Sequence, residues 1–398
     1  MESTERLEAP KDRIHSDITL FLCGDCMTGR GIDQILPHPV PPHLYEPYVR
    51  DACRYVEFAE RLNGPIPRNA PFDYVWGDAL AELRRRAPDA KVVNLETAVT
   101  TSEEHWPGKG IHYRMHPANA PVLTAAPLDV CALANNHVLD WGYPGLAETV
   151  ETLRHAGVRW AGAGRDLAAA EAPAFVDLPG RGRVLVFSFG TESSGIPAEW
   201  AAAPGRAGVN LLPNLSGRAV TRIGNMVRVV KRRGDIVIAS IHWGGNWGYA
   251  VPDAHREFAH RLIDEAGVDL IHGHSSHHVI GIEVYREKLV LYGCGDFITD
   301  YEGIEGYEEF RGDLRLMYFP RIDALNGRLA GVEMVPMEMR NFRVRRAARR
   351  DALWLRDLLN REGKRFGTAA ELSGDATLVL RWGERGGGDS GGPGRNGR

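Results

Sequence analysis

The chain has 398 residues, of which 43% are hydrophobic and 25% are charged, and its formal net charge is −4. This length is sufficient for one large α/β domain or for two smaller domains. The nearly balanced charge gives no electrostatic reason to expect nucleic acid or an anionic membrane surface as a partner.

The two ends of the chain are polar. The N-terminal stretch "MESTERLEAPKDRIHSD" is acidic where a secretory signal needs a basic and then an apolar segment. No apolar run approaches the ~20 residues of a membrane span, and an odd number of cysteines (five) suits a reducing compartment. We therefore expect a cytoplasmic protein without a membrane anchor in this chain. Residues 1–14 and the Gly-rich tail 385–398 are predicted to be disordered because they have little to bury.

Short apolar runs alternate with segments of helical periodicity along most of the chain. The runs are continuous rather than alternating, which is typical of strands that are covered on both faces. The expected strands are 17–25, 90–96, 127–135, 157–164, 183–190, 235–244, 268–274 and 288–297. The expected helices are 43–63, 75–87, 145–157, 219–234 and 254–267. This alternation predicts an α/β fold with an extensive sheet.

The pattern changes near the C-terminus. Two further strands are expected at 314–322 and 330–339, followed by a helix around 350–367. We therefore predict a main domain over residues 15–345 and a C-terminal helical extension over residues 346–384.

Five of the expected strands end in residues that can bind a metal. These residues are Asp25, Glu96, Asn135, Asn136, His137, His242, His272, His274, His277 and His278. In an open α/β sheet, ligands collect at the carboxyl ends of the strands. Carboxylate, carboxamide and imidazole ligands together suit divalent ions such as Mn, Fe or Zn. The sequence therefore predicts a metal site at this rim.

Each of these features has a simpler explanation when it stands alone. A single histidine at a strand end is more often a hydrogen-bonding residue, "ANNH" could be a turn, and Asp25 could cap a helix. The occurrence of all five strand ends in one chain favours the metal site. The pair Cys23 and Cys26 forms a C-x-x-C, which we interpret as packing at a strand end rather than as a redox motif.

Other polar segments are candidates for substrate contacts. Arg30 follows the first strand and could bind a phosphate or carboxylate in a bidentate manner, or form a salt bridge. The segment "GKGIHYRMHP" (108–117) could be a substrate loop, and "WGGNWGY" (243–249) could be a stacking wall or part of the core. We predict substrate contact for Arg30.

Six motifs together resemble a known family. They are "GDCMTGRG", "NLET", "NNHVLDWG", "HWGGN", "GHSSHHV" and "YGCGDF". In this order they resemble the CapA family of capsule or poly-γ-glutamate synthesis proteins, which is similar to the calcineurin-like metallophosphoesterases. The resemblance covers about residues 18–320. It implies a four-layered α/β/β/α sandwich around a centre of two divalent metal ions.

The resemblance also implies roles for individual residues. Asp25 and His277 match ligands of the first metal, and Glu96 stands at the bridging position. Asn136, His242 and His274 match ligands of the second metal. His137 matches a residue that contacts substrate or acts as a general acid, and Asp140 is placed to orient its ring and to keep it protonated.

The sequence departs from the wider phosphoesterase pattern at several positions. Met27 stands where those enzymes have a histidine, and a thioether is a poor ligand for a hard ion, so we expect a weaker first metal site. Asn246 and the sequences "GHSSH" and "GDF" also differ from common family patterns.

Three functions remain open at this point. The first, which we favour, is a metal-dependent phosphoesterase acting on a small anionic substrate. The second is a role in poly-γ-glutamate or capsule metabolism, through γ-glutamyl amide chemistry or as an assembly component. The third is a metal-bearing interaction protein without turnover.

Overall fold

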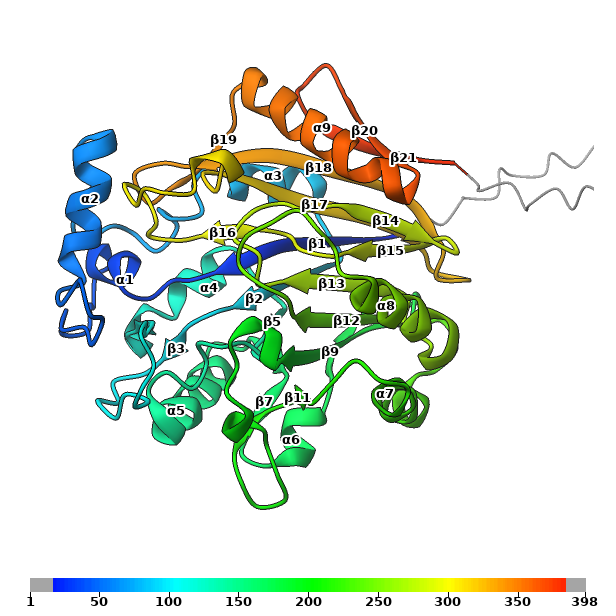
Figure 1. The fold of residues 1–398 in the computed structure, drawn as a ribbon, viewed down its shortest axis with the longest axis horizontal. Helices are drawn as coiled ribbons and strands as arrows, with labels where there is room; N and C mark the ends of the chain where they lie inside the picture. Colours follow the sequence, from blue (N-terminus) through cyan, green and yellow to red (C-terminus); the bar gives the residue numbers. More distant parts are fainter. Residues whose placement is uncertain (1–16, 384–398) are drawn as a thin grey trace, which may run out of the picture.

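Two β-sheets face each other at the centre of the molecule and helices cover their outer faces (Figure 1). The structure is a computed structural model that describes residues 17–383. The predicted disordered ends, 1–14 and 385–398, lie outside the described residues.

The first sheet has ten strands and contains the N-terminal strand at its centre. Its main path runs β20-β21-β18-β17-β1-β2-β5-β6, while β16 pairs with β1 and β19 with β18. The bounds are β1 Asp17–Cys26, β2 Ala90–Leu95, β5 Val130–Ala132, β6 Arg159–Ala161, β16 Asp296–Ile298, β17 Leu314–Asp323, β18 Leu329–Met339, β19 Val344–Arg346, β20 Thr368–Leu372 and β21 Leu378–Trp382. β1, β2, β5 and β6 are parallel, whereas β17 is antiparallel to β1.

The second sheet has seven strands in the order β11-β9-β12-β13-β15-β14, with β8 paired to β9. Its strands are β8 Ala174–Asp177, β9 Arg183–Thr191, β11 Leu211–Leu212, β12 Ile236–His242, β13 Leu270–His274, β14 Ile282–Tyr285 and β15 Lys288–Leu291. Two small pairs lie outside the sheets: β3 (Ala98–Val99) with β4 (Arg114–Met115), and β7 (Ala163–Gly164) with β10 (Gly208–Val209).

Alternating side chains of the strands build separate cores. In β1, Leu20 and Leu22 face the core between the two sheets, whereas Phe21 and Cys23 face the helices outside. The outer helices of the first sheet are α1 Gly31–Ile35, α2 Cys53–Asn63, α3 Ala79–Arg86, α4 Pro121–Ala125 and α5 Gly142–His155. Those of the second sheet are α7 Gly217–Val230 and α8 Asp253–Ala266. The short α6 is Leu167–Glu171. The predicted four-layered α/β/β/α sandwich is therefore confirmed.

The C-terminal segment is more closely joined to the sandwich than the sequence suggested. The expected helix is α9 (Arg349–Gly363), and its apolar face packs into the core between the sheets through Leu355, Leu358 and Leu359. β20 and β21 then pair with each other, and β21 pairs with β18. Residues 346–384, predicted to be a helical extension, thus also contain the edge of the first sheet.

The expected helix over residues 43–63 is shorter in the structure, where α2 begins at Cys53. Pro47 lies within the missing part, and proline disfavours a helical conformation of the residue before it. That residue, Glu46, is instead fully buried and accepts hydrogen bonds from Arg30 and Tyr55. Within residues 17–383, no helix combines the length and the apolar character that crossing a membrane requires.

Candidate metal centre

The carboxyl ends of five parallel strands deliver the predicted ligands to one place. Asp25 lies near the end of β1, Glu96 follows β2, and Asn136 follows β5. His242 and His274 are the last residues of β12 and β13, and they are directly opposite in the register of these strands. The first sheet thus supplies mainly oxygen ligands and the second sheet supplies imidazoles.

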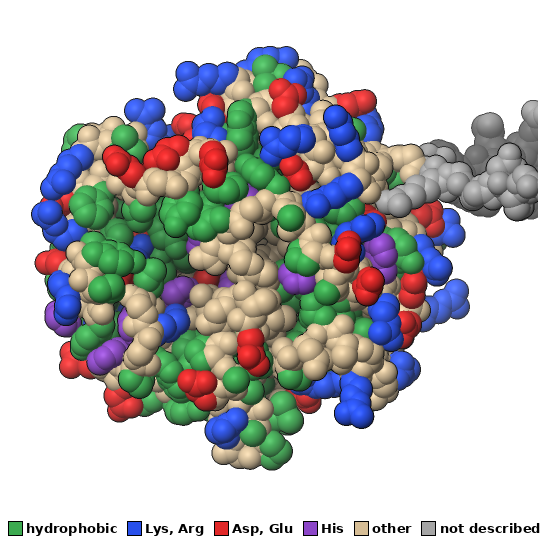
Figure 2. Space-filling view, viewed as in Figure 1, with side chains coloured by type: hydrophobic (Ala, Val, Ile, Leu, Met, Phe, Trp, Pro, Cys, Tyr) green, Lys and Arg blue, Asp and Glu red, His purple; other side chains and the backbone are tan. Residues whose placement is uncertain are grey.

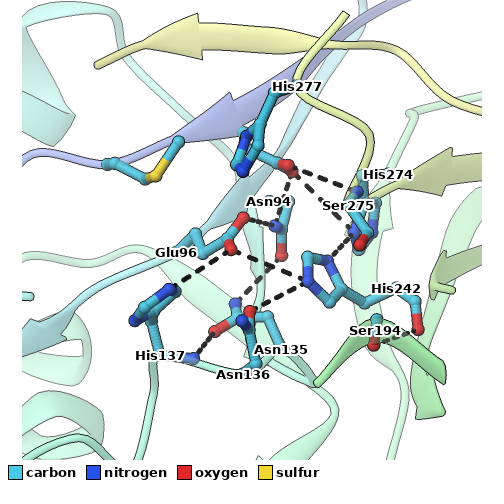
Figure 3. A network of polar contacts seen from close by, with 12 residues as sticks. Asn94, Glu96, Asn135, Asn136, His137, Ser194, His242, His274, Ser275 and His277 are labelled. Atoms are coloured by element: carbon cyan, nitrogen blue, oxygen red, sulfur yellow. Dashed lines mark hydrogen bonds and ion pairs between the residues drawn. The ribbon is translucent and has the colours of Figure 1, made fainter. Parts of the chain in front are cut away.

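The imidazoles lie close to the oxygen ligands (Figure 3). His242 Nδ1 is 2.8 Å from His274 Nδ1, and His242 Nε2 is 3.0 Å from the Asn136 side-chain oxygen. One carboxylate oxygen of Asp25 lies 4.0 Å from His274 Nδ1. One ligand atom each from Asp25, His242 and His274 lies within 4.8 Å of the others, a spacing that could hold a metal ion.

Glu96 and His277 lie at two sides of this group. Glu96 Oε1 is 3.6 Å from His242 Nε2. His277 Nδ1 is 2.9 Å from Asp296 Oδ1, so this histidine is held by a carboxylate of β16. Although burial opposes a positive charge, Asp296 raises the pKa of His277 above its ordinary value.

A buried amide connects the two carboxylates of the first sheet. Asn94 Nδ2 donates to Asp25 Oδ1 at 2.8 Å and to Glu96 Oε2 at 3.1 Å (Figure 3). Asn135 in turn donates to the Asn94 side-chain oxygen at 3.0 Å. These bonds fix the carboxylates side by side despite their mutual repulsion.

Burial and like charge disfavour ionisation of these acids. Burial, followed by the neighbouring carboxylate of Asp296, raises the pKa of Asp25 to about 7. Burial and then Asp25 raise the pKa of Glu96 well above its ordinary value. Burial, together with neighbouring imidazoles, lowers the pKa values of His242 and His274 well below the ordinary value, so both rings are neutral. Neutral imidazole is the form that binds metal.

The donor set fits a divalent cation. Among residues 17–383, none of the carboxylates of Asp25, Glu96 and Asp296 forms an ion pair with lysine or arginine. Buried acids that lack such partners are stabilised in the ionised form by a cation. Carboxylates, a carboxamide oxygen and imidazoles are the ligands that Mn, Fe and Zn take in proteins.

His137 lies beside the centre in a group of its own. Its Nε2 is 3.9 Å from Glu96 Oε1, and its Nδ1 is 2.7 Å from Asp140 Oδ2. Lys109 Nζ is 3.0 Å from the same Nδ1 and donates to the other oxygen of Asp140. Asp140 therefore orients the ring, as the sequence predicted.

The surroundings of His137 in this structure disfavour its protonated form, against the expectation that Asp140 keeps the ring protonated. Burial is the largest influence and lowers the pKa of His137 to about 4, and the positive charge of Lys109 lowers it further against the effect of Asp140. A neutral imidazole donates a proton from Nε2 only when its Nδ1 is unprotonated. A hydrogen bond from Lys109 to Nδ1 favours that tautomer, whereas Asp140 favours the other.

The structure contradicts substrate contact by Arg30. Its guanidinium donates to both oxygens of Asp300 and to Glu46, and its side chain is buried. It also lies 3.6 Å above the Tyr55 ring and 4.6 Å from the Tyr113 ring. Because its charge is neutralised by these partners, Arg30 holds the loop before α2 and is not a free anion-binding group.

Several other candidates have packing roles. Trp247 stacks on Tyr307 at 4.0 Å and also contacts His278, so it belongs to an aromatic cluster. His272 bonds to the Cys23 carbonyl and to Ser240, which accounts for both ring nitrogens. Cys23 and Cys26 are buried in β1 with their sulfurs 3.9 Å apart, as expected of packing residues.

Sequence reasoning missed two residues of the centre and left one undecided. Asn94 was not singled out, although it stands two positions before Glu96 and therefore faces the same side of the strand. Asp296 was noted only as a departure in "GDF". Lys109 was considered within a possible substrate loop, but nothing in its local sequence indicated the contact with His137.

Figure 2 shows histidine atoms and an acidic atom together at the base of a hollow between apolar surfaces. Most residues of the centre are buried: Asp25 and His274 are 0% exposed, His242 is 1%, Glu96 is 2% and His137 is 7% exposed.

Three comparisons relate this chain to known proteins. The family described as "Bacterial capsule synthesis protein PGA_cap" matches residues 19–301. A "Probable polyglutamine synthesis accessory protein" of Mycobacterium tuberculosis is 50% identical over 364 residues, covering 91% of this chain and 96% of that protein. The "PGA biosynthesis protein CapA" of Bacillus subtilis is 26% identical, covering 79% and 71% of the two chains.

Among solved structures, a phosphatase from Mycoplasma pneumoniae aligns with a TM-score of 0.43 and 8% identity, over 81% of this chain and 94% of that chain. The match over residues 19–301 includes every residue of the metal centre described above. With half of all residues identical to the mycobacterial protein over nearly the full length of both, the chain belongs to the bacterial capsule synthesis family that contains CapA.

Proposed function

We propose that this protein is a metal-dependent hydrolase that holds two divalent cations and acts on a small anionic substrate, with a phosphoester as the first candidate. The observation that carries the proposal is the buried convergence of Asp25, His242 and His274, with Glu96 and Asn136 in contact with His242. His277 would complete the position nearest to Asp25.

When bound, the cations would generate a nucleophile from water near neutral pH and stabilise negative charge on the substrate oxygens. The protein side chains then have separate tasks. Asn94 keeps Asp25 and Glu96 in place through two hydrogen bonds. His137, with Nε2 directed toward Glu96, is placed to give a proton to the leaving group as its bond to phosphorus breaks.

Lys109 and Asp140 prepare His137 for that transfer. Both contact Nδ1, so they fix the direction of the ring. As Nε2 gives its proton to the leaving group, Lys109 would pass a proton to Nδ1, so that the imidazole stays neutral and changes tautomer while Lys109 becomes neutral. Burial of this group keeps bulk water from competing for the proton.

The second candidate reaction is hydrolysis of a γ-glutamyl amide. The names of the relatives, which refer to synthesis of poly-γ-glutamate or polyglutamine, favour it. The same residues would serve, since water would add to the carbonyl carbon and the departing amine would take the proton from His137. A place in capsule or polyglutamate metabolism and a cytoplasmic location accordingly belong to this proposal.

The test uses purified full-length protein that has been stripped of metal and then reloaded with Mn²⁺, Zn²⁺ or Fe²⁺. It would be assayed against phosphomonoesters, phosphodiesters and γ-glutamyl amides, including oligomers of γ-linked glutamate. Metal-dependent turnover of one class, lost in His242→Ala, is the expected result. Binding of metal without turnover of any class would favour a non-catalytic accessory role and contradict the hydrolase.

A further inference from the structure

Asp296 lies next to Asp25 although 271 positions separate them in the chain. β16 pairs in parallel with β1, and Asp25 and Asp296 are partners in the register of these strands. Registered residues of neighbouring strands point to the same face of the sheet. The carboxylate of Asp296 therefore faces the same side as the carboxylate of Asp25.

The two oxygens of Asp296 have different surroundings. Oδ1 accepts a hydrogen bond from His277 Nδ1 at 2.9 Å. Oδ2 is buried without a hydrogen-bond partner among residues 17–383, and Asp296 as a whole is 1% exposed. Burying a carboxylate oxygen without a partner costs free energy. A ligand bound to this atom would therefore stabilise the protein.

Arg315, whose charge interacts with that of Asp296, does not supply that partner. Arg315 is buried on β17, and its guanidinium donates to the carbonyls of Phe297 and Gly312 and to the Thr299 hydroxyl. It influences the electrostatics of the region but makes no hydrogen bond to Asp296. The second carboxylate oxygen stays free for a ligand that the described residues do not provide.

Met27 does not add a hard ligand on this side of the centre. It is fully buried two residues after Asp25, and its thioether sulfur accepts the Tyr301 hydroxyl at 3.5 Å. A thioether suits soft ions such as Cu(I) rather than Mn²⁺ or Mg²⁺.

We propose that Asp296 is a metal ligand, with Oδ2 binding the cation that Asp25 and Glu96 hold while Oδ1 positions His277. This inference rests on the proposed metal-dependent function and specifies its cation. Three carboxylates with one imidazole make an oxygen-rich position that prefers Mn²⁺ or another hard ion. His242, His274 and Asn136 make a nitrogen-rich position that suits Zn²⁺ or Fe²⁺ as well. Asp296 thereby supplies the donor that Met27 does not.

The decisive variant is Asp296→Asn. Its amide oxygen can still accept the hydrogen bond from His277, but the charge and the carboxylate ligand are removed. Mn²⁺ binding would be measured by isothermal titration calorimetry and by counting bound ions with electron paramagnetic resonance. We expect two ions for wild type, and for the variant either a single ion or a more than tenfold weaker second ion. If the variant kept two ions within tenfold of the wild-type affinity, Asp296 would only position His277 and the proposal would be wrong.

Thermal unfolding of the metal-free proteins gives a second readout. The removal of one of three neighbouring buried carboxylates should raise the unfolding temperature of the metal-free variant, whereas added Mn²⁺ should raise it less than in wild type. A purely structural role predicts a lower unfolding temperature without metal. Asp269→Asn is the matched control, because this buried aspartate lies at the opposite strand ends, and it should leave the ion count at two.

If Asp296→Asn does not fold, a crystal of wild-type protein soaked in Mn²⁺ gives the answer from anomalous scattering. A manganese peak within about 2.4 Å of Asp296 Oδ2 would support the proposal, and a peak bound only through the other residues would overturn it. Wild-type protein that binds no divalent ion in any of these measurements would instead contradict the proposed function itself.

Discussion

Carboxylates at the amino ends and at the carboxyl ends of the parallel strands differ in their charged partners. At the amino ends, an aspartate precedes each of four strands and pairs with a lysine or arginine. These pairs are Asp89 with Arg181, Asp129 with Lys91, Asp235 with Arg183, and Asp269 with Lys231 and Lys288. At the carboxyl ends, Asp25, Glu96 and Asp296 form no ion pair with lysine or arginine among residues 17–383, and they accept hydrogen bonds from amides and a histidine.

The acids at the amino ends also accept backbone hydrogen bonds that join neighbouring strands. Asp89 accepts from the Thr19 N–H, Asp129 from Lys91 N–H and Asp269 from Val237 N–H. These carboxylates therefore stabilise the sheet. The acids of the metal centre have no lysine or arginine partner in the described part of the chain, which destabilises the metal-free protein but leaves room for a cation. Acids occur at both ends of the strands. The candidate site differs in that its acids lack lysine or arginine partners among residues 17–383.

The largest expected effect comes from His242→Ala. This change removes the ring that contacts both His274 and Asn136, so the nitrogen-rich position loses its central ligand. We expect loss of at least one bound ion and loss of turnover for every substrate. Metal content by mass spectrometry and the substrate panel would check this. His155→Ala, at the exposed end of α5, is the control and should behave like wild type.

The next effect should be seen in His137→Ala. The ring lies beside the ligands without being one, so both ions should stay bound. Turnover should fall by about 10²–10⁴-fold, the usual contribution of a general acid. The loss should be smaller for nitrophenyl esters, whose leaving group departs without a proton. Release of metal, or equal losses for fast and slow leaving groups, would make His137 a ligand or a binding residue instead.

For the acids of the metal centre, the absence of lysine and arginine partners among the described residues also predicts that the stability of the metal-free protein depends on pH. The pKa of Asp25 is raised to about 7 in the folded protein, so its contribution to stability is fully present below about pH 4 and is lost as the pH rises to 7. Metal-free wild type should therefore lose stability relative to Asp25→Asn over this range, by a few kcal/mol in order of magnitude. Urea unfolding at several pH values measures the difference.

Metal binding should reverse this trend and release protons below pH 7, because Asp25 must ionise to bind. Calorimetric titrations in buffers of different ionisation enthalpy count those protons. His137 titrates in the opposite sense: with its pKa lowered to about 4, it costs stability as the pH falls from about 6.5 to 4. Because wild type and Asp25→Asn both contain His137, its contribution cancels when their stabilities are compared. A difference that does not change with pH would show that Asp25 is ionised throughout.

The smallest effect should follow Asp269→Asn at the amino ends. The amide keeps an acceptor for the Val237 N–H, but Lys231 and Lys288 lose their carboxylate. We expect a loss of about 1–3 kcal/mol in the free energy of unfolding. Metal content and turnover should not change. A loss of metal would show that Asp269 at the amino ends of the strands affects metal binding at their carboxyl ends. The two groups of acids would then not have separate roles.

The sequence predicted the centre well where ligands follow strands directly. His242 and His274 end their strands, so the strand pattern alone places both at one rim. The prediction failed where a distant segment decides the environment. Arg30 looked free because Asp300, its main partner, stands 270 positions away. The neutral state of His137 depends on burial and on Lys109, neither of which a local pattern reveals.

The fold was predictable to a similar degree. Continuous apolar runs identified the central strands, since each is covered on both faces. The helix expected from residue 43 begins only at Cys53, because Pro47 disfavours a helical conformation of Glu46, whose side chain instead accepts from Arg30. The pairing of β21 with β18 joins residues that are far apart in sequence, so periodicity could not show that the C-terminal segment completes a sheet.

The central position of β1 has a consequence for synthesis in the cell. This first strand pairs with β2 on one side and with β17 and β16 on the other, so its final neighbours leave the ribosome about 270 to 300 residues later. Until then β1 presents an unpaired apolar edge, which favours wrong pairing between chains. Nascent chains that stop before β17 should therefore aggregate or bind chaperones, and the metal centre can be assembled only after nearly the whole polypeptide has emerged.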